Sequence, residues 1–175
     1  KKKIVEHLTG LDETPGDYSR KAFRKEKQFI FVARNEKRKG YTKLISAWSS
    51  YKGKGHLHVV GDFNPIDGAK NISFYGEIKD KEELAVLYKN ADFIVLPSYA
   101  EGMPMVILEA AQFGAIPICT NVGAISSYFS SKEAIWTEIG SSQSLAYSLN
   151  TADKLSKTKM QEMRKSFSSK SDQFT

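Results

Sequence analysis

Residues 93–109, FIVLPSYAEGMPMVILE, join a short apolar run to a longer apolar segment through a small polar loop. Four consecutive apolar residues stopped by Pro97 are typical of a strand buried on both faces. Pro104 stands where a helix can begin, and the segment that follows it runs to Gly114. This stretch therefore predicts a strand, a loop and a helix in that order.

The same alternation of short apolar runs and amphipathic segments extends to both sides. Further strands are expected at 29–33, 56–60, 71–75 and 116–119, with a weaker one at 134–136. Helices are expected at 41–51, after an N-cap at Asp80 with Glu83 three residues on, and at 125–129. This order predicts an α/β fold: a doubly wound, Rossmann-like parallel sheet with helices on both faces. Such sheets bind ligands at the C-terminal ends of their strands.

Three segments are expected along the chain: a lead-in at 1–28, the Rossmann-like domain at 29–150, and an amphipathic helix with a frayed tail at 151–175. Four residues could form the apolar stripe of that last helix: Leu155, Met160, Met163 and Phe167. A surplus amphipathic helix needs something to dock on, and a missing domain is one candidate. Because the first residue is Lys1 and not Met, we expect the chain to be an excised piece.

Composition narrows the class of protein. Of 175 residues 41% are hydrophobic, and these come in blocks separated by charged residues, which excludes a disordered chain. The net charge is +6. Much of the excess lies in Lys1–Lys3, Arg20, Lys21, Arg24, Lys25 and Lys27. A solvated face is the favoured interpretation of these residues, and a nucleic-acid patch is not, because aromatic residues are not interleaved with them. The lone Cys119 is expected to be an inert core residue, and it fits a reducing compartment.

Two carboxylates stand out after the strand at 93–96. Glu101 lies in the loop, and Glu109 lies in the second turn of the following helix, which is otherwise apolar. A loop carboxylate can bind sugar hydroxyls, whereas a buried Glu109 needs donors such as the vicinal hydroxyls of a ribose. The amides of Met105 and Val106 are free at the helix N-terminus and suit a phosphate. A solvated loop residue and a salt-bridged surface residue are equally good interpretations of the two glutamates.

A second cluster, Arg34-Asn35-Glu36-Lys37-Arg38-Lys39-Gly40, begins where a strand ends and finishes where a helix starts. A guanidinium and an ammonium group that converge there could neutralise a diphosphate leaving group. Taken alone, the segment is better explained as an ordinary charged turn. His56 and His58 lie on one face of a strand, but no third metal ligand accompanies them, so we expect no metal site.

Taken together and in order, these segments resemble the C-terminal domain of the group-one family of retaining glycosyltransferases. These enzymes have two Rossmann-like domains, the GT-B fold. The matching residues are Arg34, Lys39-Gly40, Asn71–Gly76, Leu84, Tyr88, Ala91-Asp92, Leu96-Pro97-Ser98, Glu101-Gly102, Pro104, Glu109-Ala110, Gly114 and Pro117. The resemblance covers roughly 29–129. A weaker one lies upstream, where Leu8–Asp12 is similar to a Gly-Val-Asp segment that often precedes this domain.

The resemblance implies a role for each matching position. Arg34 and Lys39 would bind the donor's diphosphate, and Glu101, with the backbone amides just after it at Gly102 and Met103, would hold hydroxyls of the donor sugar. The amides of Met105 and Val106 would face the phosphates, Glu109 would bind the ribose, and the main chain near Ile78 would meet the base. The donor would be a UDP- or GDP-hexose, with no cofactor and no bound metal, because Arg34 and Lys39 supply the positive charge.

The sequence departs from the family in two places. Ala33 replaces a glycine before Arg34, which is a mild change. After the strand at 116–119 the family often has Gly-Gly-Ile-Pro-Glu, and of this only Gly123 and Ile125 are well kept here. The resemblance also implies an N-terminal domain that carries the acceptor site and is not in this chain. The chain alone is therefore expected to bind nucleotide but to transfer sugar poorly.

The expected whole enzyme transfers a hexose to a glycan or lipid acceptor in cell-envelope polysaccharide synthesis. It would be cytoplasmic, and its basic face would suit peripheral attachment to the inner, anionic face of the membrane. Three alternatives remain: half of a sugar-nucleotide epimerase, a non-catalytic module that binds nucleotide sugars or a partner protein, and a nucleic-acid binder. A missing N-terminal domain in the parent protein would favour the module, and a steep loss of affinity with salt would favour the nucleic-acid binder.

Overall fold

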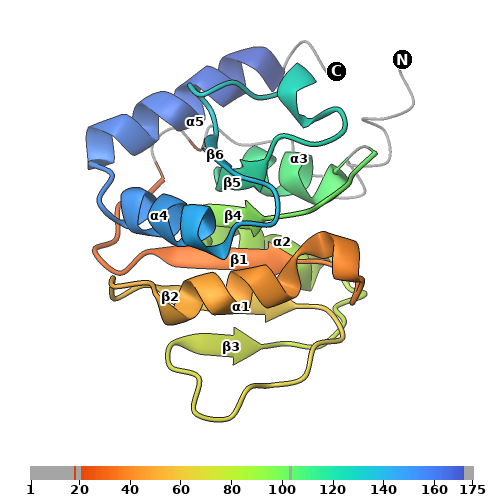
Figure 1. The fold of residues 1–175 in the computed structure, drawn as a ribbon. Helices are drawn as coiled ribbons and strands as arrows, with labels where there is room; N and C mark the ends of the chain where they lie inside the picture. The colour runs from red at the N-terminus through yellow and green to blue at the C-terminus, as the bar shows by residue number, and fades with distance from the viewer. Residues whose placement is uncertain (1–17, 19–20, 103, 172–175) are drawn as a thin grey trace.

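The computed structural model describes residue 18 and residues 21–102 and 104–171. Six parallel strands form one sheet in the order β3-β2-β1-β4-β5-β6 (Figure 1). The strands are β1 (Gln28–Val32), β2 (His56–Val60), β3 (Ile72–Phe74), β4 (Phe93–Leu96), β5 (Ile116–Thr120) and β6 (Ile135–Thr137). This is the strand order of the doubly wound Rossmann fold, so the expected fold class is confirmed.

Helices cover both faces of the sheet. They are α1 (Tyr41–Ser49), α2 (Lys81–Asn90), α3 (Met105–Gln112), α4 (Ser142–Asp153) and α5 (Lys157–Ser171), with 3-10 turns at η2 (Lys37–Lys39) and η3 (Ile125–Ser127). Figure 1 shows α1 and α4 in front of the sheet and α2 and α3 behind it. Side chains alternate along each strand. Phe29 and Phe31 therefore join the core under α1 and α4, while Ile30 joins a second cluster with Tyr88 of α2 and Ala110 of α3.

Most predicted elements differ from the observed ones only at their ends, but three expectations need correction. The segment expected as a helix at 125–129 is the single turn η3, and α4 was not expected at all. The apolar stripe of the C-terminal segment does not need a missing domain to cover it, because Met160, Met163 and Phe167 are buried in the core of this same chain. The helix α5 packs against α3 and β5.

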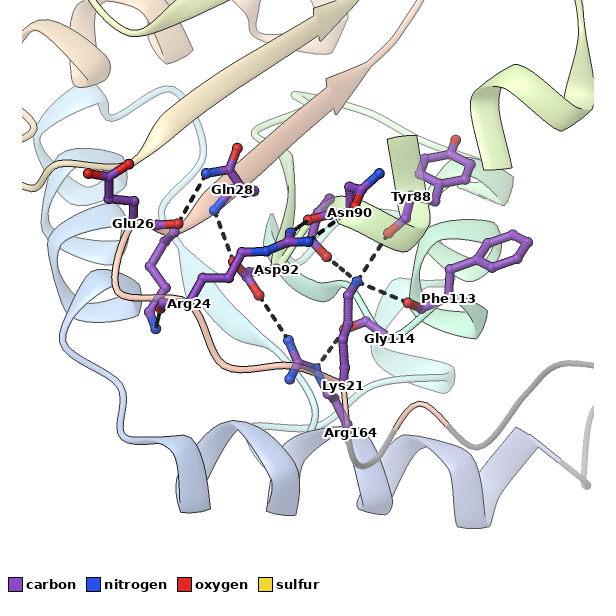
Figure 2. A network of polar contacts seen from close by, with 12 residues as sticks. Lys21, Arg24, Glu26, Gln28, Tyr88, Asn90, Asp92, Phe113, Gly114 and Arg164 are labelled. Carbon is purple, nitrogen blue, oxygen red and sulfur yellow. Dashed lines mark hydrogen bonds and ion pairs between the residues drawn. The ribbon is translucent and has the colours of Figure 1, made fainter. Parts of the chain in front are cut away.

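Within the basic lead-in, Lys1–Lys3 and Arg20 lie outside the described residues and Lys25 is exposed as expected, but Lys21 is not part of a solvated face, as Figure 2 shows. The Lys21 ammonium donates to the carbonyls of Tyr88 (3.2 Å) and Phe113 (3.1 Å), and to that of Ala91. These carbonyls lie at the C-terminal ends of α2 and α3, where a cation is stabilised by the helix dipole. Burial lowers the pKa of Lys21 to about 7, and the nearby charge of Arg164 acts in the same direction.

A buried ion pair lies next to Lys21. Asp92 accepts from Arg164 Nη2 at 3.3 Å and from the Gln28 amide at 3.0 Å, and Arg164 Nε donates to the Gly114 carbonyl at 2.8 Å. The side chains of Asp92 and Arg164 are 1% and 3% exposed. The pair therefore ties α5 to the starts of β1, β4 and β5, at the edge of the sheet opposite the C-terminal strand ends.

The two strand histidines bind neighbouring polar side chains. His56 Nε2 lies 2.8 Å from Ser73 Oγ, and His58 Nδ1 and Nε2 lie 2.7 Å from Tyr75 Oη and 2.9 Å from Gln28 Oε1. Because Gln28 Oε1 can only accept, Nε2 of His58 carries the proton and Nδ1 accepts from Tyr75. Burial lowers the pKa of His58 to about 4, and the neighbouring His56 contributes.

This lowered pKa predicts acid sensitivity. Between pH 6.5 and about 4 the unfolded chain binds a proton at residue 58 that the folded chain does not, so stability falls as the pH falls through this window. Between about pH 7.5 and about pH 5.5 the wild type should lose about 1 kcal/mol more than His58→Gln, after allowance for solvent screening of the partly exposed ring. Urea unfolding at both pH values measures this, and equal losses in the two proteins would contradict it.

Candidate functional site

The sheet has one topological switch point, between β1 and β4. The chain leaves β1 for α1 on one face and leaves β4 for α3 on the other, so the loops after these two strands diverge. A crevice at the C-terminal ends of two such strands is the usual ligand site of this fold. The two loops, 33–40 and 97–104, contain most of the candidate site residues predicted from the sequence.

Close backbone contact joins these two loops. Gly40 has a φ of 75°, and a Cβ atom there would lie 2.1 Å from the carbonyl oxygen of Pro97, so only glycine fits. The amide of Tyr99 donates to the carbonyl of Arg38 at 2.7 Å. The loop after β1 is thereby fixed against the loop after β4.

Glu101 lies at the centre of this junction, with its side chain 4% exposed. Lys39 Nζ lies 2.7 Å from Glu101 Oε1 and 2.9 Å from Oε2. Ser98 Oγ donates to Oε1 at 2.6 Å, and Arg38 Nη1 lies 3.4 Å from Oε2. Lys39 and Glu101, which are 62 residues apart in the sequence, therefore form one buried charge cluster. No role was expected for Ser98 and Arg38 from the sequence.

The loop after β5 supports Glu101 from the other side. Gly123 has a φ of 59°, and a Cβ atom there would lie 2.0 Å from the carbonyl oxygen of Glu101. The amide of Ala124 donates to the carbonyl of Gly102 at 3.2 Å, and Thr120 Oγ1 donates to the carbonyl of Ser98 at 2.6 Å. The two family positions kept in this loop are thus structural, since Ile125 is fully buried as well.

Replacement of Gly123 by alanine should destabilise the fold and displace the Glu101 loop. The left-handed backbone costs a non-glycine residue about 1–2 kcal/mol, and the contact with Glu101 adds to that. Gly68→Ala is the matched control, because Gly68 has a φ of 73° and open space where the Cβ would lie. Urea unfolding should show a clearly larger loss for Gly123→Ala, and equal losses would show that Gly123 does not hold the loop.

Glu109 lies on α3, facing α2. Tyr88 Oη lies 3.5 Å from Glu109 Oε2, and burial raises the pKa of the Glu109 carboxyl above its ordinary value, although Tyr88 and Lys81 oppose the shift. Ile78, just before α2, and Val106 on the first turn of α3 pack against the apolar cluster that contains Tyr88. Ile78, Val106 and Glu109 therefore gather where α2 and α3 meet behind the sheet.

The remaining predicted residues lie around the two loops that follow β1 and β4. Arg34 is exposed directly after β1, and among the described residues its side chain has no hydrogen-bonding or ionic partner. Gly102 is exposed, and Met103 lies outside the described residues. Met105 and Val106 form the first turn of α3, after the N-cap Pro104, so their amides point out of the helix end. A hollow of about 480 Å³ is lined by Glu36, Lys37, Arg38, Tyr41, Thr42 and Tyr99.

This arrangement can bind an anionic, hydroxyl-rich ligand. Cations and free helix amides lie beside two carboxylates that accept from hydroxyl groups. The described residues contain no helix that is both long and apolar enough to cross a membrane.

Comparison with known proteins identifies the family. Residues 17–173 match the family described as glycosyl transferases group 1. The chain is 33% identical over 120 residues to TuaC of Bacillus subtilis (strain 168), a protein named for teichuronic acid biosynthesis as a glycosyltransferase. That match covers 67% of this chain and 30% of TuaC. The chain spans no more than a third of the length of the curated relatives that it matches.

Solved structures show the same fold. The C-terminal domain of LpcC, a group 1 family protein from Francisella tularensis, superposes with a TM-score of 0.74 at 22% identity, over 98% of this chain and 97% of that one. HepE of Anabaena in complex with UDP and glucose superposes with a TM-score of 0.68 at 20% identity, over 83% of this chain and 44% of that one. The chain therefore belongs to the group 1 glycosyltransferases, and its fold is that of their C-terminal domain.

Proposed function

We propose that this chain binds the donor of a retaining glycosyltransferase, which transfers a hexose from a nucleoside diphosphate sugar to a glycan or lipid acceptor. The observation that carries the proposal is the buried cluster of Lys39 and Glu101 at the switch point of the sheet. It offers a cation for a diphosphate and a carboxylate for sugar hydroxyls at one place. Retention of the anomeric configuration is proposed from the resemblance to the retaining family.

Each part of the donor would have its own partner. Arg34 and Lys39 would bind the diphosphate and stabilise the charge that develops on it as it leaves. Glu101 and the amides of Gly102 and Met103 would hold the sugar, and the amides of Met105 and Val106 would face the phosphates. Glu109 would accept from the ribose hydroxyls, and the main chain at Ile78 would meet the base. We propose that the two cations make a metal ion unnecessary for the transfer.

The proposed nucleotide is UDP, and the proposed acceptor is a cell-envelope polysaccharide or its lipid-linked precursor. The UDP complex of HepE supports the first choice, and the role in teichuronic acid biosynthesis for which TuaC is named supports the second. We further propose that a second domain brings the acceptor, that the chain alone transfers sugar poorly, and that the enzyme works at the inner face of the membrane.

Calorimetric titration of the chain with UDP, GDP and ADP tests the proposal. The expected result is saturable binding of UDP, weaker binding of the other two, and no change when a chelator is added. Failure of all three to bind at millimolar concentration would contradict the donor-site assignment. Retention is tested on the full-length protein by NMR, which reports whether the product keeps the anomeric configuration of the donor.

A further inference from the structure

In the proposed function Lys39 binds the diphosphate and Glu101 binds the sugar, yet without a donor the two side chains form an ion pair with each other. Two of the short contacts in the cluster join the Lys39 ammonium to the two oxygens of Glu101, at 2.7 and 2.9 Å. The side chain of Lys39 is only 15% exposed. A diphosphate that binds Lys39 must therefore compete with the Glu101 carboxylate, and the two anions would repel each other.

Glu101 has two partners besides Lys39. Ser98 Oγ donates to Oε1 at 2.6 Å and Arg38 Nη1 lies 3.4 Å from Oε2, and neither contact involves Lys39. A carboxylate with these two donors stays oriented, and the lone pairs that Lys39 releases become free to accept from hydroxyl groups.

Arg38 is itself fixed independently of Lys39. Its Nε lies 2.6 Å from Glu36 Oε2, and its Nη1 lies 3.2 Å from the carbonyl oxygen of Ala100. Its own carbonyl accepts from the Tyr99 amide at 2.7 Å. The guanidinium thus bridges the loop after β1 and the loop after β4, and a lysine at this position could not form the same bridge with its single ammonium group.

We propose that Arg38 is a positioning residue of the donor site: it holds the Glu101 carboxylate in place while Lys39 exchanges that carboxylate for the donor's diphosphate. The inference rests on the proposed function. Its consequence is a preference for the intact donor. Free nucleoside diphosphate breaks the contacts of Lys39 with Glu101 and offers nothing in return, whereas a nucleotide sugar also supplies hydroxyl groups to the carboxylate that is set free.

The test compares the dissociation constants of UDP and UDP-glucose for four forms of the chain: the wild type, Glu101→Gln, Arg38→Gln and Lys37→Gln. Lys37→Gln is the matched control. Like Arg38→Gln it removes one positive charge, and Lys37 is the neighbour of Arg38 and lines the same hollow. Among the described residues the Lys37 side chain contacts no carboxylate. The binding stoichiometry from the same titrations reports the folded fraction of each variant.

Glu101→Gln should bind UDP about threefold to tenfold tighter than the wild type, because the competing charge is gone. In the same variant the preference for UDP-glucose over UDP should be smaller than in the wild type. Arg38→Gln should lower the preference for UDP-glucose over UDP by about fivefold or more, whereas Lys37→Gln should leave that preference unchanged.

The outcomes separate the inference from the function on which it rests. If UDP binds the wild type but Glu101→Gln binds it no tighter, Lys39 and Glu101 do not compete and the inference is overturned. A preference for UDP-glucose that is unchanged in Arg38→Gln overturns it as well, while the donor site stands. If neither the wild type nor Glu101→Gln binds UDP, the proposed function fails and the inference fails with it.

Discussion

Asp92→Ala is expected to lower the free energy of unfolding by about 3–5 kcal/mol, because it leaves a buried cation without its counterion. Among the described residues, Arg164 would keep the carbonyl of Gly114 as its one hydrogen-bond partner, and the amide of Gln28 would lose its acceptor. Lys21 would lose the one nearby charge that favours its protonated form. Urea denaturation followed by circular dichroism measures the loss.

The matched control is Glu162→Ala, which also removes a carboxylate from an ion pair. The Lys159–Glu162 pair lies on the surface of α5, with side chains 52% and 61% exposed, so its loss should change stability by less than about 0.5 kcal/mol. Similar losses for Asp92→Ala and Glu162→Ala would show that the buried network does not anchor α5 to the sheet.

Glu109→Ala is expected to weaken UDP binding about 10-fold to 100-fold, because charged hydrogen bonds to two ribose hydroxyls are lost. The fold should not suffer, since the substitution removes a carboxyl whose burial raises its pKa and disfavours its charge. As the pH falls through this raised pKa, the wild type should lose UDP affinity more steeply than Glu109→Ala, in which only the phosphate of UDP itself titrates. Calorimetry over a pH series measures both effects.

Glu82→Ala controls for the change in net charge. Glu82 is exposed on the first turn of α2. It should bind UDP like the wild type. If Glu109→Ala also binds UDP like the wild type, Glu109 is a structural residue of α3 and does not contact the ribose.

The fold could be predicted in large part because two central strands, β4 and β5, are buried on both faces. Phe93–Leu96 and Ile116–Thr120 read as continuous apolar runs, and central parallel strands require such runs. The helix α4 was not predicted because its sequence has no strong apolar pattern. Its sequence, SQSLAYSLNTAD, is rich in serine and poorly apolar, and only its position over the sheet buries Leu145 and Leu149.

Two parts of the candidate site could be selected from the sequence. The motif around Glu101 and the basic segment that ends at Lys39 could be selected because a sheet of this class brings its strand ends together. The contacts of Ser98 and Arg38 depend on the paths of two loops, which no periodicity encodes. Lys21 was misinterpreted as part of a solvated face because its partners are helix-end carbonyls, and a sequence does not reveal these contacts.

The central claim is that UDP binds at the C-terminal ends of β1 and β4. It is tested most directly by titrating the isotope-labelled chain with UDP and following the backbone amides by NMR. The largest shifts are predicted at Ile78, Gly102, Met105 and Val106, with little change at Gly55 and Gly114 on the opposite edge of the sheet. Shifts confined to that opposite edge, or no shifts at millimolar UDP, would contradict the account.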